Sequence, residues 1–383
     1  MKMISFSFRS SQASLETALF SVGLQLVFLM FPLGSLRAGG ENLGGTTFNW
    51  KNLQSDIDGV ADRTDPNLVN SWGLAINPNS NIFWVADNGT GVSTLYRPDG
   101  TPFPVGNPLV VTIPPTSADT EPPIHSAPTG IVFNPFAKLF KGAIFIFDGE
   151  DGSVAAWSGG ASAVIEVDNS ASGAVYKGLA LAVRPNGVPT LYATNFHSGH
   201  VDIFDSQFGP VTIAGSFVDP NPPPVPTGAS GWGPFNIAAI DNHIYVTFAA
   251  QDADKHDDVR GPGNGFVDVF NTQGAFIKRL ITGGNLNSPW GLAKVPFSGF
   301  GGLGPHVLLV GNFGDGFINA FQIQSGEFRG QLLHRKDQPL AFNGLWSLFF
   351  FNGRLYFTAG IADEADGLFG FIRPVEEGDH DDQ

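Results

Sequence analysis

The chain has 383 residues, with 20 Lys and Arg against 35 Asp and Glu, and a formal net charge of −15. This acidic balance repels phosphate backbones and argues against nucleic-acid binding, while it suits cations, neutral ligands or basic partners. There is no Cys, which excludes thiol catalysis, zinc thiolate sites, iron–sulfur clusters and disulfides.

The N-terminal segment is predicted to direct export. A basic start precedes an apolar run from about Leu19 to Leu33, and small residues follow at positions 38–40. This order is typical of a secretory signal peptide, here residues 1–38, with a linker at residues 39–46. We expect a secreted protein, extracellular or periplasmic, with no membrane span after signal removal. Retention of the apolar run as an N-terminal anchor is the alternative.

A short apolar phrase, usually entered through Gly, recurs about every 50 residues. Each copy precedes a second segment rich in aliphatic, aromatic and β-branched residues, as strands are. Such a period, with several strands per unit, is typical of a β-propeller with one sheet per blade. The sequence predicts an all-β, six-bladed propeller with four-stranded antiparallel blades over residues 47–374. The copies are residues 72–75 (WGLA), 129–132 (TGIV), 177–180 (KGLA), 235–238 (FNIA), 290–293 (WGLA) and 346–349 (WSLF).

The last blade lacks a fourth strand of its own, because the chain turns acidic after Pro374. A strand at residues 47–53 is predicted to pair into this blade and close the ring, which removes an exposed sheet edge. Residues 375–383 are mostly charged and are predicted to form a disordered tail. Fourth strands of the other blades are predicted at residues 110–113, 163–167, 211–217, 275–281 and 328–333.

Several second strands end at Asp or Asn, and a Gly then opens the third strand. In a meandering blade, these turns share a face with the loops between blades, so we expect a site on that face. Carboxylate and amide oxygens from several blades, converging near the axis, suit Ca²⁺ or Mg²⁺. The competing interpretation is that each side chain caps its own turn. The residues are Asp87, Asp148, Asn195 and Asn312.

Two histidine positions on the same face are candidate ligand-binding residues. His125 lies in a long loop between blades, whereas His197 lies in a turn after a second strand, close to His200. A His at a channel mouth can act as a general base or a metal ligand. Exposed histidines in turns are also common without such a role.

Three tryptophans occupy the first position of the repeated phrase: Trp72, Trp290 and Trp346. They are candidate ligand-binding residues, because indoles lining a channel can stack on a sugar or a quinone. The alternative is that they wedge between blades as core residues.

Blade four carries an acidic insertion at residues 249–264, which includes Asp252, Asp254, His256, Asp257 and Asp258. Its composition is similar to that of a calcium loop, but the Gly and terminal Glu spacing of an EF-hand is missing. A lid over the channel mouth and a solvated loop are the two interpretations.

Residues 65–75 (DPNLVNSWGLA), 290–293 (WGLA) and 311–316 (GNFGDG) resemble an uncharacterised family of exported propeller proteins. The resemblance covers roughly residues 47–374 and implies the fold and export. The blade phrasing is also similar to NHL-type and gluconolactonase/lactonase-type six-bladed propellers. That wider resemblance implies a divalent-cation hydrolase in some relatives and binding modules in others.

In lactonase-type propellers Asn and Asp oxygens hold the metal, and Asn236 is a further match in residue type. The family's ligating Glu near the first blade and its catalytic base have no matched equivalent in this sequence. The metal assignment by resemblance is therefore incomplete.

Motifs of several other chemistries are absent from the sequence. There is no Gly-rich phosphate loop, G-x-S-x-G elbow or H-E-x-x-H helix, which disfavours nucleotide, serine-hydrolase and zinc-protease chemistry. We expect a monomer that binds an unidentified small molecule or protein through its loop-rich face. The alternative is a divalent-cation-dependent hydrolase or lactonase with a metal at the central channel. A quinone-dependent dehydrogenase is a third interpretation, which lacks a basic cluster for the cofactor's carboxylates.

Overall fold

The computed structural model describes residue 43 and residues 46–116, 125–335 and 337–375. The predicted signal peptide and nearly all of the predicted tail lie outside these residues. The chain divides into residues 1–39 and residues 40–383, and the second unit holds every element described below. Within the described residues, no helix is both long and apolar enough for a membrane span.

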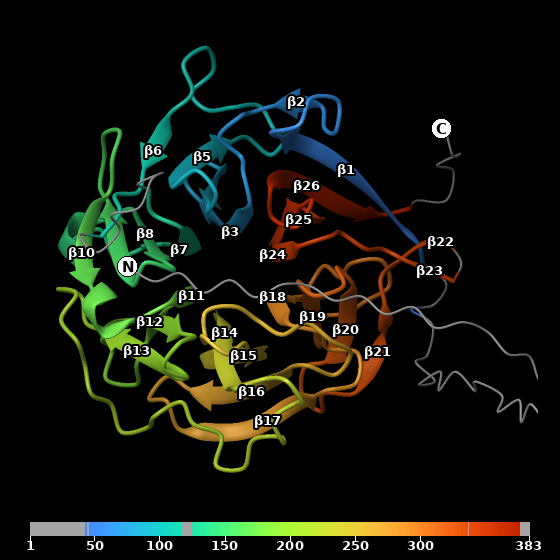
Figure 1. The fold of residues 1–383 in the computed structure, drawn as a ribbon. Coiled ribbons are helices and arrows are strands. Elements are labelled where there is room, and N and C mark those ends of the chain that lie inside the picture. The colour runs from blue at the N-terminus through green and yellow to red at the C-terminus, as the bar shows by residue number, and fades with distance from the viewer. Residues whose placement is uncertain (1–42, 44–45, 117–124, 336, 376–383) are drawn as a thin grey trace, which may run out of the picture. The chain divides into compact units, whose positions relative to one another are not determined.

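Six sheets surround one axis, which confirms the predicted six-bladed propeller (Figure 1). Blade one consists of β3 (Ser71–Asn77), β4 (Ile82–Asp87), β5 (Val92–Tyr96) and β6 (Val110–Thr112). Blade two consists of β7 (Pro128–Phe133), β8 (Phe145–Gly149), β9 (Ser153–Trp157) and β10 (Val164–Asp168). Blade three has three strands, β11 (Tyr176–Val183), β12 (Pro189–Asn195) and β13 (His200–Phe204).

The remaining blades follow the same meander. Blade four consists of β14 (Gly231–Ile240), β15 (His243–Gln251), β16 (Phe266–Asn271) and β17 (Phe276–Thr282). Blade five consists of β18 (Pro289–Lys294), β19 (Val307–Asn312), β20 (Ile318–Gln322) and β21 (Phe328–Gln331). Blade six contains β24 (Leu345–Phe351), β25 (Arg354–Ile361) and β26 (Asp366–Pro374). A small hairpin, β22 (Leu333–Arg335) with β23 (Gln338–Pro339), and two 3₁₀ turns, η1 (Phe140–Gly142) and η2 (Ser170–Ser172), lie outside the blades.

The N-terminal strand closes the ring, as the sequence predicts. β1 (Phe48–Ser55) pairs antiparallel with β26, from Phe48 opposite Pro374 to Ser55 opposite Leu368, and β2 (Arg63–Thr64) adds a short parallel edge. Phe48 and Leu53 are buried where β1 meets the blades. The innermost strand β24 of the last blade lies beside β3 of the first, so the ring is continuous.

The fourth strand predicted for blade three at residues 211–217 does not form. Beyond β13, only an isolated bridge joins Phe204 to Pro210, and Pro has no N–H to continue a ladder. The segment instead donates hydrogen bonds to the β16–β17 turn of blade four, from the Gly215 and Phe217 amides to the Gln273 and Gly274 carbonyls. This segment therefore connects two blades and leaves blade three with three strands.

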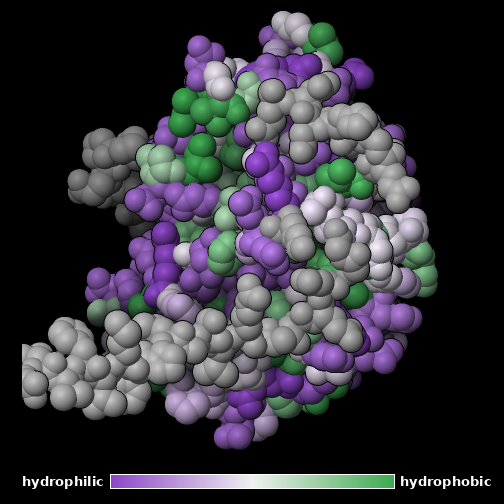
Figure 2. Space-filling view, turned by 90° about the vertical axis from the view of Figure 1, so that its right-hand side faces the viewer, coloured by the Kyte–Doolittle hydropathy of each residue, from purple (hydrophilic) through white to green (hydrophobic). Residues whose placement is uncertain are grey.

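The repeated turns after the second strands explain the Gly signal in the sequence. Gly91, Gly199 and Gly316 have φ values of 67°, 76° and 74°, a left-handed conformation that favours Gly. Their amides donate to the carbonyls of Asp87, Asn195 and Asn312 at 3.0 Å each. The outer side of the ring seen in Figure 2 mixes hydrophilic residues with small groups of hydrophobic ones.

Turns after the second strands also bind the segments that precede the first strands. The Asn88 amide donates to the Asn70 carbonyl at 3.1 Å, and the Phe313 amide donates to the Ser288 carbonyl at 2.9 Å. The two groups of loops therefore share one face, as the meander predicts. We call it the loop-rich face.

Candidate functional site

A buried aromatic cluster lies on the axis, toward the loop-rich face. Trp72 stacks on Trp346 with ring centroids 3.4 Å apart, and Phe313 stacks on the other side of Trp346 at 3.9 Å. Trp290 meets both indoles edge-on, and its Nε1 donates to the Lys177 carbonyl at 2.9 Å. We call this set, completed by Phe196 and Phe235, the aromatic floor.

The three predicted tryptophans are therefore packed against one another, with exposed fractions of 2%, 4% and 1% for Trp72, Trp290 and Trp346. This packing agrees with the core interpretation. Trp72 and Trp346 would meet a ligand only if the floor opened, whereas Trp290 also lines the larger of the two cavities described below. A direct ligand-binding role for the three stays a prediction.

Lys177 lies on the floor at the start of β11 and is almost completely buried. Its Nζ lies 5.3 Å from the Trp72 ring centroid and 5.8 Å from that of Phe196, within cation–π range. It forms ion pairs with Glu150 and, at 3.3 Å, with Asp257. Burial lowers the pKa of Lys177, but the two carboxylates outweigh it, so the net pKa is raised and the ammonium stays charged.

Glu150 approaches from blade two, just after β8. Its amide donates to the Ala127 carbonyl at 3.0 Å, which fixes the loop. Its Oε1 pairs with Lys177, and its Oε2 accepts a hydrogen bond from Asn88 Nδ2 of blade one at 2.8 Å. One carboxylate thus connects three blades at the mouth of the ring.

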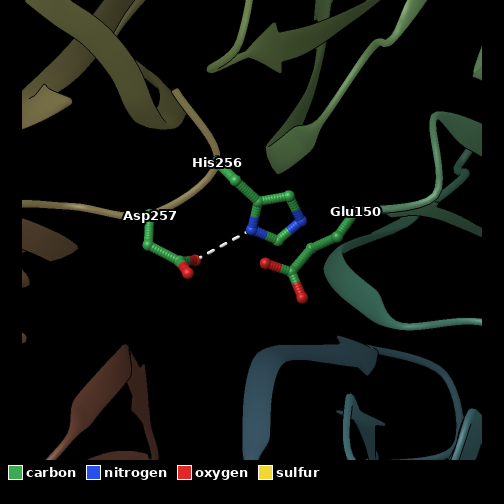
Figure 3. Close-up of side chains that lie close together, drawn as sticks. All are labelled: Glu150, His256 and Asp257. Atoms are coloured by element: carbon green, nitrogen blue, oxygen red, sulfur yellow. Dashed lines mark hydrogen bonds and ion pairs between the residues drawn. The ribbon is translucent and has the colours of Figure 1, made fainter. Parts of the chain in front are cut away.

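His256 and Asp257 come from the blade-four insertion and face Glu150 (Figure 3). His256 Nδ1 and Asp257 Oδ1 are 3.0 Å apart, and this contact raises the pKa of His256. The same contact, together with Lys177, lowers the pKa of Asp257. One ligand atom from each of Glu150, His256 and Asp257 lies within 4.8 Å of the others, so these three side chains could hold a metal ion.

The insertion reaches Lys177 through Asp257 and is held by hydrogen bonds within itself. A lid role for it stays a prediction. The Asp252 amide donates to the Asp257 carbonyl, and the His256 amide donates to Asp252 Oδ1, both at 2.9 Å. Arg260 places its guanidinium 4.3 Å from the Phe313 ring centroid, on the floor. Asp258 is largely enclosed, and burial raises the pKa of its carboxyl.

Blade six completes the mouth through the β25–β26 turn. Asp363 and Glu364 lie 3.8 Å and 3.9 Å from the Arg260 guanidinium nitrogens. Burial, followed by repulsion from Glu150, raises the pKa of Glu364 to about 7. We call the set of Glu150, Lys177, His256, Asp257, Asp258, Arg260, Asp363 and Glu364 the charged mouth.

The two predicted carboxylates of the metal ring have partners within their own blades. Asp87 Oδ2 accepts hydrogen bonds from the Thr94 amide at 3.0 Å and from its hydroxyl at 2.7 Å. Asp148 Oδ1 accepts from the Gly130 amide at 2.7 Å and from the Thr129 hydroxyl at 3.0 Å. Burial raises the pKa of Asp148 to about 7 and raises that of Asp87 well above its ordinary value.

The three predicted amide ligands also have hydrogen-bond partners: Asn195 and Asn312 within their own blades, and Asn236, on the innermost strand of blade four, in blade five. Asn195 Nδ2 donates to Asp202 Oδ2 at 3.0 Å, Asn236 Nδ2 to the Trp290 carbonyl at 2.7 Å, and Asn312 Nδ2 to Asp315 Oδ1 at 3.0 Å. These contacts agree with the structural interpretation of the turns. A metal role for these residues stays a prediction.

The predicted histidines lie on different blades. His125 precedes β7, and its Nδ1 is 2.8 Å from the Ser126 carbonyl oxygen. His197 lies in the β12–β13 turn, where its carbonyl accepts a hydrogen bond from Gln251 Nε2 at 3.5 Å. His256, which the sequence offers only as part of the insertion, is the imidazole that joins the charged mouth.

Sequence reasoning missed Glu150, Lys177, Arg260 and Glu364 as site residues. One signal was available: Lys177 is the charged residue at a repeat position where the other copies have Trp, Thr or Phe. A buried lysine needs counter-ions, so this exception predicts nearby carboxylates.

A cavity of about 490 Å³ opens beside the charged mouth and is lined by Glu150, Asp151, Thr116, Ser170 and His256, among others. A larger cavity of about 780 Å³ runs along the axis beyond the aromatic floor. We place the candidate site at the smaller cavity, because Glu150 of blade two and His256 of the blade-four insertion, two members of the charged mouth, line it.

Comparison with known sequences and structures defines the relatives of the chain. No family model matches it. A solved structure of unknown function from Bacteroides thetaiotaomicron has a TM-score of 0.51 at 13% identity, covering 86% of this chain and 76% of that one, and shows the same fold. A suspected gluconolactonase has a TM-score of 0.48 at 12% identity, covering 87% of this chain and 95% of that one.

Two uncharacterized proteins of Acanthamoeba polyphaga mimivirus are 31% and 32% identical to this chain over 359 and 337 residues. The alignments cover 90% and 84% of this chain, and 83% and 84% of the mimivirus proteins. These two relatives confirm the resemblance to an uncharacterised family. This chain, a six-bladed β-propeller, therefore belongs to the same family as these two uncharacterized mimivirus proteins.

Proposed function

We propose that this protein is an exported, monomeric binding module that takes a positively charged small ligand at its charged mouth. The observation that carries the proposal is the convergence of Glu150, Asp257 and Glu364, from three blades, around one buried lysine. The acidic side chains of the mouth outnumber its two cations, Lys177 and Arg260. A cation is therefore the ligand that the local field favours.

The adjacent cavity gives such a ligand a place to bind. Its volume of about 490 Å³ lies within the range of about 300–1,000 Å³ typical of small-molecule pockets. Glu150 and Asp151 supply carboxylates to its wall, and His256 supplies an imidazole that is about half exposed. The formal net charge of −15 would also raise the rate of encounter with cations.

Export is part of the proposal and is supported by the N-terminal sequence. If residues 1–38 are a signal peptide, N-terminal sequencing of the secreted protein will begin near residue 39. A secreted form that retains the apolar run would contradict cleavage and favour an anchor.

The second candidate function is that of a divalent-cation-dependent hydrolase. It is supported by the grouping of Glu150, His256 and Asp257, whose carboxylate and imidazole ligands suit a first-row divalent ion. The Lys177 ammonium lies against both carboxylates of this group, so a metal would have to compete with it. This competition is the reason that binding of an organic cation is the first proposal.

Thermal unfolding separates the two candidates. The protein would be measured after EDTA treatment, then with spermidine as the organic cation, and then with Ca²⁺, Mg²⁺ or Zn²⁺, all at 0.15 M salt. A ligand at about 100 times its Kd adds about 2.7 kcal/mol to the free energy of unfolding. Spermidine stabilisation that Glu150→Gln abolishes would support the first proposal, and metal stabilisation that His256→Ala abolishes would support the second.

Matched controls come from residues remote from the mouth. Glu327→Gln removes an exposed carboxylate, and His243→Ala removes an exposed imidazole. Both variants should keep any stabilisation that arises at the mouth. If the controls reduce stabilisation as much as the mouth variants do, the effect comes from the general acidity of the chain, and the assignment to this site is wrong.

A further inference from the structure

The larger cavity, of about 780 Å³, follows the axis of the ring on the side of the aromatic floor away from the charged mouth. Innermost strands of all six blades contribute to its wall. Trp290 lines it and also belongs to the floor, so the floor forms its closed end. We call this cavity the axial channel. Its apolar lining includes Ile131, Leu179, Ile237, Leu292 and Leu348.

The wall of the axial channel combines two kinds of surface. Most lining residues are Gly, Ala, Val, Ile, Leu or Phe, so an apolar ligand would cover apolar surface that otherwise faces water. The innermost strand of each blade is also the terminal strand of its sheet among the described residues. The edge of this strand that faces the axis therefore presents backbone N–H and C=O groups that no neighbouring strand of that sheet pairs. The wall thus offers apolar contact with a limited number of hydrogen-bonding positions.

The channel reaches the face opposite the loop-rich face, where Pro78 and Asn242 of the first-to-second turns line it. Apolar groups are exposed around this end. Val183 lines the channel and is 45% exposed. Phe297 is 89% exposed and lies beneath the ammonium of Lys294, another lining residue, at 5.7 Å. Lys294 is paired with Asp241, so the rim offers little net charge to a ligand.

We propose that the axial channel is a second binding site, for a neutral and largely apolar small molecule that carries a few hydroxyl or carbonyl groups. The volume lies within the range of small-molecule pockets, and the innermost strands of all six blades surround it. The paired rim disfavours a charged ligand. The aromatic floor separates this site from the charged mouth, so the two sites bind independently.

Titration with N-phenyl-1-naphthylamine, a neutral apolar fluorophore, tests the channel. We expect saturable fluorescence with one probe per chain. Ala182→Phe and Ala238→Phe add an aromatic ring at two lining positions, which also pack against the core between blades, and should weaken probe binding at least tenfold. Val183→Asp, at the exposed rim, should also weaken probe binding. Because its side chain is exposed, this variant can fold even if the two Phe variants cannot. Circular dichroism would establish that each variant is folded.

The matched control is Ala161→Phe, which adds the same ring at an exposed position outside the channel. It should leave the affinity for the probe unchanged, and so should Glu150→Gln at the charged mouth. Probe fluorescence that does not saturate, or affinity that folded channel variants retain, would overturn the proposal. Affinity lost in Glu150→Gln and kept in Ala182→Phe would instead place the probe at the charged mouth and also overturn it.

Discussion

Replacement of Lys177 by Met is expected to destabilise the ring through the carboxylates that it leaves behind. Met retains much of the apolar stem above Trp72 but removes the ammonium. Loss of one partner of a buried ion pair costs about 3–5 kcal/mol. The side chain of Glu150 is 14% exposed, whereas that of Asp257 is 68% exposed and can return to water. The carboxylate of Glu150 therefore accounts for most of the lost stability. We expect a loss at the lower end of the range for a buried ion pair, about 3 kcal/mol.

This free energy converts to a measurable change in Tm. The entropy of unfolding is about 2.1 cal/mol/K per residue, which gives about 0.7 kcal/mol/K for a ring of roughly 330 residues. A loss of about 3 kcal/mol then lowers Tm by about 4 °C. Circular dichroism at pH 7 would follow the melting of wild type and variant. Lys138→Met, at an exposed position, is the control for the loss of one lysine.

A double variant tests the physical reason. Lys177→Met combined with Glu150→Gln removes both charges of the closest pair, so it should recover most of the lost stability. The reasoning would be refuted if Lys177→Met melted within 1 °C of Lys138→Met, or if the double variant were less stable than Lys177→Met alone.

Four further predictions concern the titration of two buried carboxyl groups and the closure of the ring. Burial raises the pKa of Glu364 from 4.5 to about 7. The contribution of Glu364 to the free energy of unfolding is therefore complete below about pH 4.5 and is lost as the pH rises through about 7. Urea unfolding at pH 5 and 8.5 should show Glu364→Gln more stable than wild type only at the higher pH. Burial raises the pKa of Asp268 from 3.8 to about 8, and both of its carboxylate oxygens lack hydrogen-bond partners. Asp268→Asn should therefore be more stable than wild type at pH 9. Equal stability of the two proteins at this pH would contradict a charged carboxylate without hydrogen bonds. Phe48→Ala should lower the free energy of unfolding in urea by about 3–5 kcal/mol. A chain that begins at residue 52 should melt at a far lower temperature than one that ends at residue 375. Equal melting temperatures of the two truncations would argue against closure of the ring by β1.

The propeller architecture was predictable because each blade carries its own local sequence pattern. The repeated apolar phrase predicts the innermost strand, and Gly91, Gly199 and Gly316 mark turns whose left-handed φ favours Gly. Blade three departed from the pattern for a long-range reason. In the segment expected to form a fourth strand, the Gly215 and Phe217 amides bind the β16–β17 turn of another blade, and the local sequence does not specify that contact.

The charged mouth was harder to predict because its partners are distant in sequence. Lys177 meets Glu150 over 27 residues and Asp257 over 80 residues. Both distances depend on the angles between blades, which no motif encodes. The Asp and Asn turn residues were visible in the sequence because they repeat, and repetition reflects the requirement of each blade for a turn rather than a shared ligand.

The pairing of β1 with β26 has a consequence for biosynthesis. Partners such as Ser55 and Leu368 are more than 300 residues apart, so a ribosome working at about 5–20 residues per second makes the second partner about 15–60 s after the first. Joining ends so far apart costs about 5 kcal/mol of chain entropy by loop-closure scaling. During that interval the nascent N-terminal segment has no strand to join, and its apolar side chains are open to misassembly with other chains. A circular permutant that joins the two strands through a short hairpin would make this contact local and should shorten the vulnerable period.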